Sequence, residues 1–278
     1  MKLICDDQHY SMQFVVCVKQ VPDPKHFHEI SLDEETKRIR REGIPAVVNP
    51  LDENAVEEAL RLRERYGGTI VAISMGPPQA ISALRKALAM GVDSAILLSD
   101  EVFAGADALA TAFTLAKGIK KLGDFDLVLC GAESVDGGTS QVPPTLAEFL
   151  GIPHAVFVRE IEHLDVRKKE LVVKRELEGG YMRVRLKMPA VISVTSEINT
   201  PRLPPAVRIM EAAKKEVKVW NAETLGIKRG EVGLQGSPTR VLEIFKPEVR
   251  RRRVVLKGDA EEVVRKAVEL LKTWGVRV

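Results

Sequence analysis

Short apolar runs alternate with longer helical patterns through the first half of the chain, and this rhythm constrains the fold most. The runs are short and bounded by turn residues, as expected for strands that are buried on both faces. They are "FVVCVKQ" at 14–20, "TIVAISM" at 69–75, "SAILLS" at 94–99 and "DLVLCG" at 126–131. Between consecutive runs lies a segment that places apolar residues at helical spacing and closes with glycine. The alternation predicts an α/β fold, with a doubly wound, mostly parallel sheet between two layers of helices.

Three segments depart from this rhythm. Residues 28–43 alternate around a polar turn and predict a surface hairpin, and residues 154–195 contain consecutive strand patterns that predict an antiparallel extension of the sheet. Residues 259–275 form an amphipathic helical pattern, with Asp259 as the expected N-cap and Gly275 as the stop. We therefore expect a C-terminal arm that packs on another subunit.

The composition excludes several classes of protein. A net charge of +3 is not a nucleic-acid signature, although Arg250 to Arg253 form a local basic run. Three widely spaced cysteines favour neither a zinc site nor a disulfide framework. No apolar run reaches the roughly 20 residues of a membrane span, and residues 1–10 do not resemble a signal peptide. We expect a cytoplasmic protein without membrane insertion, and the 29% of charged residues favours a heat-adapted source.

The loop after the fourth apolar run is the strongest candidate for a ligand site. In open parallel sheets, ligands bind beyond the carboxyl ends of the strands. Residues 131–144, "GAESVDGGTSQVPP", combine small residues that allow close backbone approach with hydroxyls that can donate to phosphate. Pro143 and Pro144 suit the first turn of a helix, and Glu133 and Asp136 suit ribose hydroxyls better than phosphate. This composition indicates a sugar-phosphate ligand such as a nucleotide.

The residues alone leave this interpretation open. Glycine-rich loops are common in α/β proteins, and this loop matches neither the G-x-G-x-x-G pattern nor a P-loop. Asn49-Pro50 is typical of a helix N-cap turn, and Cys17 and Cys130 are typical of buried strand residues. The sequence contains no recognisable triad, carboxylate pair or metal cluster, so a bound cofactor would have to supply any chemistry.

Several long motifs, taken together and in order, resemble the β subunit of electron-transfer flavoprotein. The similarity runs from about Met12 to Gly226, and it implies an adenine-nucleotide-hydrolase-like sheet that pairs with an α subunit. The motifs are "VVCVKQVPD", "NPLDENAVEEALRL", "VAISMGPPQAISALRKALAMGVDSAILLSD", "FAGADALAT", "LVLCGAESVDGGTSQVPPTLAEFLGIP" and "LKMPAVISVTSEINTPR".

The resemblance implies one of two cofactors. Family members either hold AMP as a structural ligand or bind a second FAD and bifurcate electrons. "DGGTSQ" at 136–141 and "FAGADALAT" at 103–111 resemble the electron-bifurcating, FixA-like group. That assignment implies an FAD that takes hydride from NADH. One electron would go to ferredoxin, and the other through the α-subunit FAD to a quinone-linked or acyl-CoA acceptor. A nucleotide-sensing protein without a redox role is the alternative from another class.

The resemblance also implies a set of ligand-binding residues. Cys17, Asn49, Pro50, Asp52 and Met75 match positions that line the adenosine. The phosphate and ribose loop comprises Gly131, Ala132, Glu133, Ser134, Val135, Asp136, Gly137, Gly138, Thr139, Ser140, Gln141 and Val142. The segment expected nearest the flavin ring includes Phe103, Gly105, Ala106, Asp107 and Thr111.

Two places in the chain depart from the family pattern. Ala132 and Glu133 stand where a basic residue and glutamine are usual, and Ala206 and Val207 stand where a leucine usually anchors partner dehydrogenases. The second departure favours a permanent complex with further redox subunits, such as a quinone-reducing dehydrogenase and a ferredoxin-like protein. Such partners could associate the complex with a membrane.

The expected organisation of the chain follows from these patterns. We expect residues 1–11 to be an N-terminal extension, because Met12 directly precedes the first strand pattern. Residues 12–226 are expected to form the nucleotide- or flavin-binding α/β domain. Residues 227–278 are expected to form a C-terminal arm and helix that contact the partner subunit. The redox activity is expected only in the assembled complex.

Overall fold

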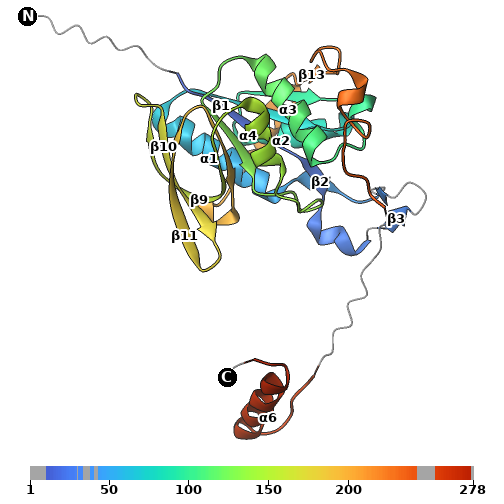
Figure 1. Cartoon of the computed structure of the whole chain (residues 1–278), viewed down its shortest axis with the longest axis vertical. Coiled ribbons are helices and arrows are strands. Elements are labelled where there is room, and N and C mark those ends of the chain that lie inside the picture. The colour runs from blue at the N-terminus through green and yellow to red at the C-terminus, as the bar shows by residue number, and fades with distance from the viewer. Residues whose placement is uncertain (1–10, 30, 34–37, 41–42, 243–253, 277–278) are drawn as a thin grey trace, which may run out of the picture. The chain divides into compact units, whose positions relative to one another are not determined.

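The computed structural model describes residues 11–29, 31–33, 38–40, 43–242 and 254–276 (Figure 1). The chain divides into two compact units, residues 1–242 and residues 243–278. The larger unit is a sheet with helices on both of its faces, and the described part of the smaller unit contains one helix, α6.

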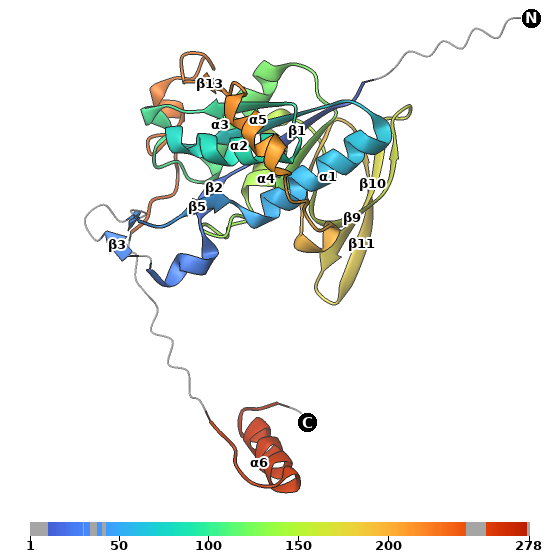
Figure 2. The same ribbon diagram turned by 180° about the vertical axis from the view of Figure 1, so that it is seen from behind.

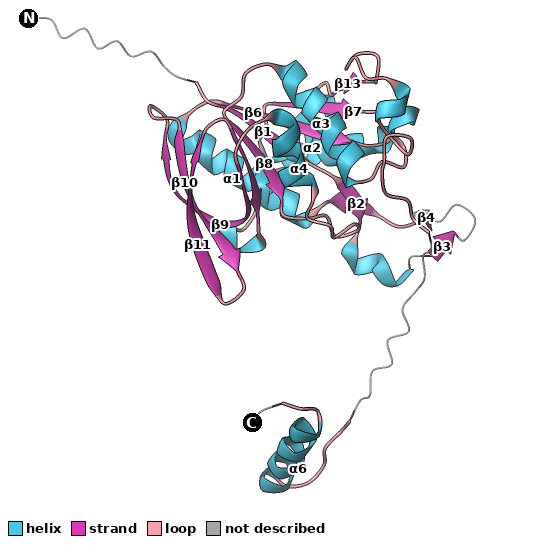
Figure 3. Ribbon diagram, viewed as in Figure 1, coloured by secondary structure: helices cyan, strands magenta, loops and turns pink. Residues whose placement is uncertain are grey.

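A nine-stranded sheet forms the centre of the larger unit, in the order β11-β10-β9-β12-β8-β1-β6-β7-β13 (Figure 3). Along this sheet order, every neighbouring pair from β9-β12 through to β7-β13 is parallel. The two pairs at the other end, β9-β10 and β10-β11, are antiparallel. The strands are β1 (Gln13–Cys17), β6 (Thr69–Met75), β7 (Ser94–Leu98), β8 (Leu127–Gly131), β9 (His154–Asp165), β10 (Glu170–Leu177), β11 (Gly180–Lys187), β12 (Ala190–Val194) and β13 (Lys218–Trp220). The predicted mostly parallel α/β sheet is confirmed.

The larger unit has two hydrophobic cores, one between each face of the sheet and the helices that cover it. On one face, α1 (Pro50–Tyr66) and α2 (Ile81–Met90) pack on the sheet, and α5 (Ala206–Lys214) packs on α2 (Figure 2). On the other face lie α3 (Ala108–Leu122) and α4 (Val142–Leu150) (Figure 1). Alternate residues of β1 enter the two cores, since side chains alternate across a strand. This double covering explains why the central strands are almost continuously apolar.

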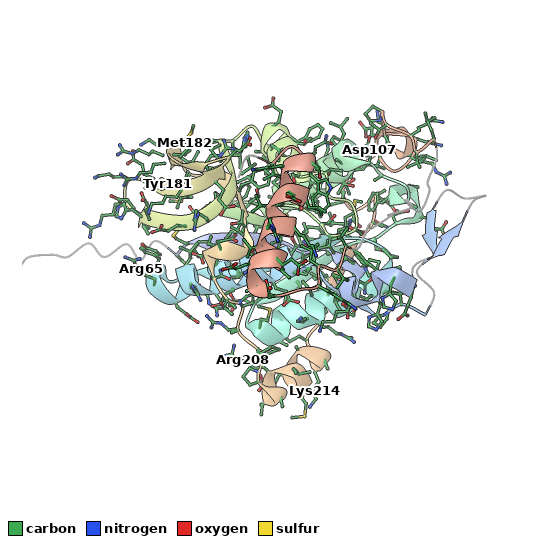
Figure 4. The ribbon with its side chains drawn as sticks, turned by 90° about the horizontal axis from the view of Figure 1, so that it is seen from below. Arg65, Asp107, Tyr181, Met182, Arg208 and Lys214 are labelled. Carbon is green, nitrogen blue, oxygen red and sulfur yellow. The ribbon has the colours of Figure 1, made fainter. Side chains whose placement is uncertain are left out.

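The antiparallel extension follows the prediction in part. Strands β9, β10 and β11 form an antiparallel ribbon at one edge of the sheet, and Tyr181 and Met182 on β11 are exposed (Figure 4). The last strand of this segment, β12, instead inserts between β8 and β9 with both neighbours parallel. Its all-buried pattern explains this placement, because both faces of β12 are covered.

Two small sheets lie outside the main one. Strand β2 (Gln20–Pro22) pairs with β5 (Ala46–Val48), and β3 (Ser31–Asp33) pairs with β4 (Arg38–Arg40). The second pair confirms the hairpin predicted within residues 28–43.

The larger unit extends to Leu242, beyond the predicted boundary at Gly226. After β13, a segment that we call the strap (residues 221–242) runs over the loop that precedes α3. Asp107 caps α3 and also accepts hydrogen bonds from the Thr239 amide at 3.1 Å and the Thr239 hydroxyl at 2.6 Å. The Ser237 hydroxyl accepts a hydrogen bond from the Asp107 amide at 2.8 Å. These contacts explain why the strap belongs to the larger unit.

The described part of the smaller unit centres on α6 (Ala260–Thr273). Asp259 accepts a hydrogen bond from the Glu262 amide, and the Gly275 amide donates to the Lys272 carbonyl, so both predicted helix ends are confirmed. Val264 on α6 and Trp274, which directly follows the helix, are largely exposed. The predicted basic run at Arg250 to Arg253 lies outside the described residues, as does residue range 1–10 of the predicted extension.

Candidate functional site

A cavity of about 160 Å³ lies at the carboxyl ends of β1, β6 and β8. Strand β1 is the point at which successive crossover connections diverge, with β8 on one side and β6 on the other. Ligands of open α/β sheets bind at such a point. The residues that line the cavity are Cys17, Val18, Lys19, Asp52, Ile73, Met75, Thr111, Leu115, Cys130, Gly131, Ala132, Glu133, Ser134, Thr139, Ser140, Val142 and Pro143.

Two cysteines form part of the cavity floor. Cys17 ends β1 and Cys130 lies near the end of the neighbouring strand β8, and both are buried, as predicted. Hydrogen bonding with Cys17 and burial raise the pKa of the Cys130 thiol above its ordinary value. A protonated thiol is a weak nucleophile, so Cys130 serves here as a small apolar wall.

Asp52 ties the first turn of α1 to the ends of two strands. Its carboxylate accepts hydrogen bonds from the Lys19 amide at 2.7 Å, the Gly131 amide at 3.1 Å and the Asn49 side-chain amide at 3.0 Å. Burial raises the pKa of Asp52 to about 7, although these hydrogen bonds oppose the shift. A carboxyl group that titrates near neutral pH therefore lies against the cavity.

Asn49 occupies the N-cap position of α1, but its side chain does not cap the helix. Its amide nitrogen donates to the Glu133 carbonyl at 2.9 Å, and its side-chain oxygen accepts from the Val135 amide at 3.1 Å. Its backbone carbonyl accepts from the Asp52 and Glu53 amides at the start of α1. Asn49 thus combines the helix-start role expected from the Asn-Pro pair with a second role, the support of residues 131–142, which we call the pocket loop.

Several backbone amides of the pocket loop already have partners within the protein. The Gly131 and Val135 amides donate to α1 side chains, and the Ala132 amide donates to the Val194 carbonyl. The Gly137 and Gly138 amides both donate to the Ser134 carbonyl, at 3.2 and 2.8 Å. The loop therefore closes on itself, and hydroxyl groups supply donors toward the cavity.

Ser140 adopts an unusual backbone conformation in this loop. Its φ of 54° lies in the left-handed region, which residues other than glycine rarely adopt. Its hydroxyl donates to a Glu133 carboxylate oxygen at 3.0 Å. Such strain is concentrated at ligand sites, where the surrounding structure maintains it.

Lys19 brings a positive charge to the cavity. Its ammonium lies 2.6 Å from an Asp136 carboxylate oxygen and 3.1 Å from the Ser134 hydroxyl. The lysine side chain is 44% exposed and the Asp136 side chain only 5% exposed. Lys19 was not among the predicted site residues, although its position near the carboxyl end of the first predicted strand was a usable signal.

The structure brings half of the predicted ligand residues together. The cavity lining contains Cys17, Asp52, Met75, Thr111, Gly131, Ala132, Glu133, Ser134, Thr139, Ser140 and Val142. Of the predicted residues that the structure describes, those outside this lining are Asn49, Pro50, Phe103, Gly105, Ala106, Asp107, Val135, Asp136, Gly137, Gly138 and Gln141. Asn49, Val135 and Asp136 act on the lining through the hydrogen bonds given above.

The segment expected nearest a flavin ring has mainly structural contacts. Phe103 is buried in the core beside α3, Gly105 has a φ of 75°, and Asp107 links α3 to the strap. Thr111 is the member of this segment that reaches the cavity wall.

The cavity has the features that an adenine nucleotide requires. Ile73, Leu115 and Val142 give apolar walls for a ring system, while Ser134 and Lys19 give polar groups at one side. Gly131 allows the end of β8 to approach α1, since an added Cβ would lie 2.8 Å from the Leu51 Cβ. A nucleotide is therefore compatible with the residues present.

Comparison with known proteins decides the family. Residues 36–225 match the profile of the electron transfer flavoprotein domain. The chain belongs to the electron transfer flavoprotein family. It is 44% identical to electron transfer flavoprotein subunit beta of Thermoanaerobacterium thermosaccharolyticum, over 94% of this chain and 98% of that protein. The resemblance derived from the sequence motifs is confirmed.

Two further relatives have more specific names. The chain is 41% identical to protein FixA of Azotobacter vinelandii, over 88% of each chain. It is 39% identical to caffeyl-CoA reductase-Etf complex subunit CarD of Acetobacterium woodii, over 94% of this chain and 98% of that protein. An electron-transfer role in association with a flavin or nucleotide is thus supported for this chain.

None of the helices in the described ranges has the length and apolarity of a bilayer-crossing helix.

Proposed function

We propose that this chain is the β subunit of an electron-bifurcating electron transfer flavoprotein and holds an FAD at the cavity between β1, β6 and β8. The observation that carries the proposal is the convergence there of apolar walls, hydroxyl groups and one lysine at the switch point of the sheet. Bound there, the flavin would supply the exchange between two-electron chemistry with NADH and one-electron chemistry with ferredoxin and a high-potential acceptor.

The residues of this chain have three separate tasks in the proposal. Ile73 and Leu115 exclude water from the apolar part of the ligand, and Lys19 with the hydroxyls of the pocket loop binds its polar part. Asn49 and Asp52 hold the pocket loop and the strand ends in register. Proton balance at the site is set in part by Asp52, whose pKa of about 7 allows it to exchange a proton near neutral pH.

The proposed partner is an electron transfer flavoprotein α subunit, reached by the smaller unit that contains α6. The exposed Val264 and the adjoining Trp274 give the described part of this unit an apolar surface for such a contact. The name of the relative CarD refers to a complex with caffeyl-CoA reductase. This name supports an assembly with a further redox subunit. We propose in addition a quinone-reducing dehydrogenase and a ferredoxin-like protein as partners, in the cytoplasm.

A conventional electron carrier that holds AMP is the second candidate. The same cavity would bind the AMP. Phe103 is buried in the core, and Asp107 is hydrogen-bonded to α3 and the strap, so neither side chain is free to contact a flavin ring, and this favours the smaller ligand. The motifs at 103–111 and 136–141 favour the bifurcating group.

A coupling assay distinguishes the two candidates. The chain would be purified with its α partner and supplied with NADH, oxidised ferredoxin and a high-potential acceptor. Bifurcation predicts that ferredoxin is reduced only when the high-potential acceptor is also present, in equal electron amounts. Reduction of the high-potential acceptor without any ferredoxin reduction would contradict bifurcation and leave the AMP-holding carrier.

A further inference from the structure

Charged side chains at the cavity include two carboxylates of the pocket loop and one lysine. The pocket loop carries two carboxylates, Glu133 and Asp136, which repel a phosphate group. The family pattern suggests a basic residue at position 132, but this chain has alanine there. Among the described residues that line the cavity, Lys19 is the only lysine or arginine.

Part of the backbone of the pocket loop is not available to bind an anion. Amides that would otherwise surround an anion are engaged by the protein at Gly131, Ala132, Val135, Gly137 and Gly138. Backbone amides also carry no net charge, so a positively charged side chain is needed to neutralise an anion at this loop. Ser134 and Thr139 offer hydroxyls, whereas the Ser140 hydroxyl already donates to Glu133, and no hydroxyl neutralises charge.

We propose that Lys19 is the phosphate-recognition residue of this site and that Asp136 positions it. This assignment rests on the proposed function. It predicts that Lys19 distinguishes a nucleotide, which carries phosphate, from a nucleoside, which does not. The Lys19 ammonium has three hydrogens, and the Asp136 carboxylate and the Ser134 hydroxyl accept two of them. The third hydrogen is left for a phosphate oxygen, and the lysine side chain, which is 44% exposed, forms part of the cavity lining.

Asp136 acts through Lys19 in this arrangement. Its side chain is almost fully buried, and its 2.6 Å contact fixes the end of a long side chain that has four rotatable bonds. A charge-assisted hydrogen bond of this kind limits the number of positions that the ammonium can adopt. The sequence had suggested that Asp136 binds ribose hydroxyls, and the two roles predict different binding results.

Calorimetric titration with AMP and with adenosine tests the proposal. The full-length chain would be freed of bound nucleotide with charcoal and titrated with each compound. Lys19→Met is expected to weaken AMP binding by about tenfold or more and to leave adenosine binding unchanged, because only AMP carries phosphate. Equal affinity ratios for AMP over adenosine in the wild type and in Lys19→Met would overturn the proposal.

Lys86→Met is the matched control. Lys86 also forms a lysine-carboxylate pair, with Glu53 on α1, but it does not line the cavity. Its loss is expected to leave both affinities unchanged. A loss of AMP affinity equal to that of Lys19→Met would show a general charge effect and contradict the assignment.

Asp136→Asn separates positioning from direct ribose contact. If Asp136 positions Lys19, the variant loses AMP affinity and keeps its adenosine affinity. The loss is smaller than in Lys19→Met, because the variant also removes a carboxylate that repels phosphate. Equal losses for AMP and adenosine would show ribose binding by Asp136 and contradict the positioning role. Failure of the wild type to bind AMP, ADP or FAD would instead remove the proposed function.

Discussion

Helix α1 fixes two loops with buried carboxylates, and the pKa values of the two carboxylates shift in opposite directions. At the start of the helix, Asp52 accepts hydrogen bonds from amides, and burial raises its pKa to about 7. Further along, Glu57 is also buried, which opposes ionisation, but Arg202 and Arg61 lower its pKa below the ordinary value. The first carboxylate lies beside an open cavity, whereas the second is neutralised within the protein.

The second cluster is a structural clamp. Arg202 binds Glu57 through two hydrogen bonds of 2.7 and 3.1 Å, and Arg61 reaches the same carboxylate at 2.9 Å. Asn54 and Asn199 bond each other in both directions beside it. We call this set the Arg202 clamp, and it holds the chain between η4 (Ser196–Ile198) and α5 against α1. The difference teaches that a buried carboxylate paired with arginine belongs to a structural cluster, while a buried carboxylate held mainly by uncharged hydrogen-bond donors beside a cavity belongs to a candidate ligand site.

The largest expected effect is on the Arg202 clamp. Arg202→Met should lower the free energy of unfolding by about 3 kcal/mol, because it leaves Glu57 buried with reduced compensation. Urea denaturation of the full-length chain measures this loss, and AMP affinity should stay unchanged. In Arg202→Met/Glu57→Gln, the loss should be smaller than in the single variant, since the uncompensated charge is gone. A loss below about 1 kcal/mol for the single variant would show that the clamp is dispensable.

A smaller effect is expected where β8 meets α1. In Gly131→Ala, the new Cβ would be placed 2.4 Å from an Asp52 carboxylate oxygen and 2.9 Å from the Leu51 carbonyl carbon. We expect a loss of about 2 kcal/mol in unfolding free energy and weaker AMP binding, because the strand end and helix must separate. Gly123→Ala is the control, since Gly123 has a φ of 96° and open space around it. It should lose about 1 kcal/mol through backbone strain but keep its AMP affinity. Wild-type AMP affinity in Gly131→Ala would show that this contact does not shape the cavity.

The last effect, and the smallest when expressed per pH unit, is a dependence of stability on pH. A folded pKa of about 7 for Asp52 lies above the value near 3.9 of an unfolded chain, so the folded state binds more protons between these values. Relative to Asp52→Asn, wild-type stability should therefore fall as pH rises from 5 to 7, by up to ~1.4 kcal/mol per pH unit. The variant also changes average stability, so the slope of the difference is the quantity to measure by denaturation at several pH values. Parallel curves would show that Asp52 does not titrate in this range.

Most of the sheet could be predicted from the sequence because its strands are buried on both faces. The central strands β1, β6, β7 and β8 are apolar runs of the right length, and their helices carry helical periodicity. The placement of β12 could not be read from the pattern, since pairing partners depend on tertiary packing. The three-residue β13 lies in a charged stretch and gave no local signal.

The candidate site was predicted in its location and only partly in its chemistry. The position of the pocket loop followed from the strand-end rule, and Thr139 and Ser140 reach the cavity as expected. Local sequence could not show that the amides of Gly137 and Gly138 bond the Ser134 carbonyl. It also could not show that Lys19 and Asp136, separated by 117 positions, form an ion pair. Such contacts depend on the fold that joins distant segments.

Nucleotide analysis of the purified complex tests the central claim most directly. The chain would be co-purified with its α partner and denatured, and the released nucleotides would be separated by chromatography and quantified per complex. We predict close to two FAD and no AMP, with one FAD belonging to this chain. One FAD with one AMP would retain the cavity as a nucleotide site but contradict bifurcation. One FAD with no further nucleotide would contradict the assignment of the cavity itself.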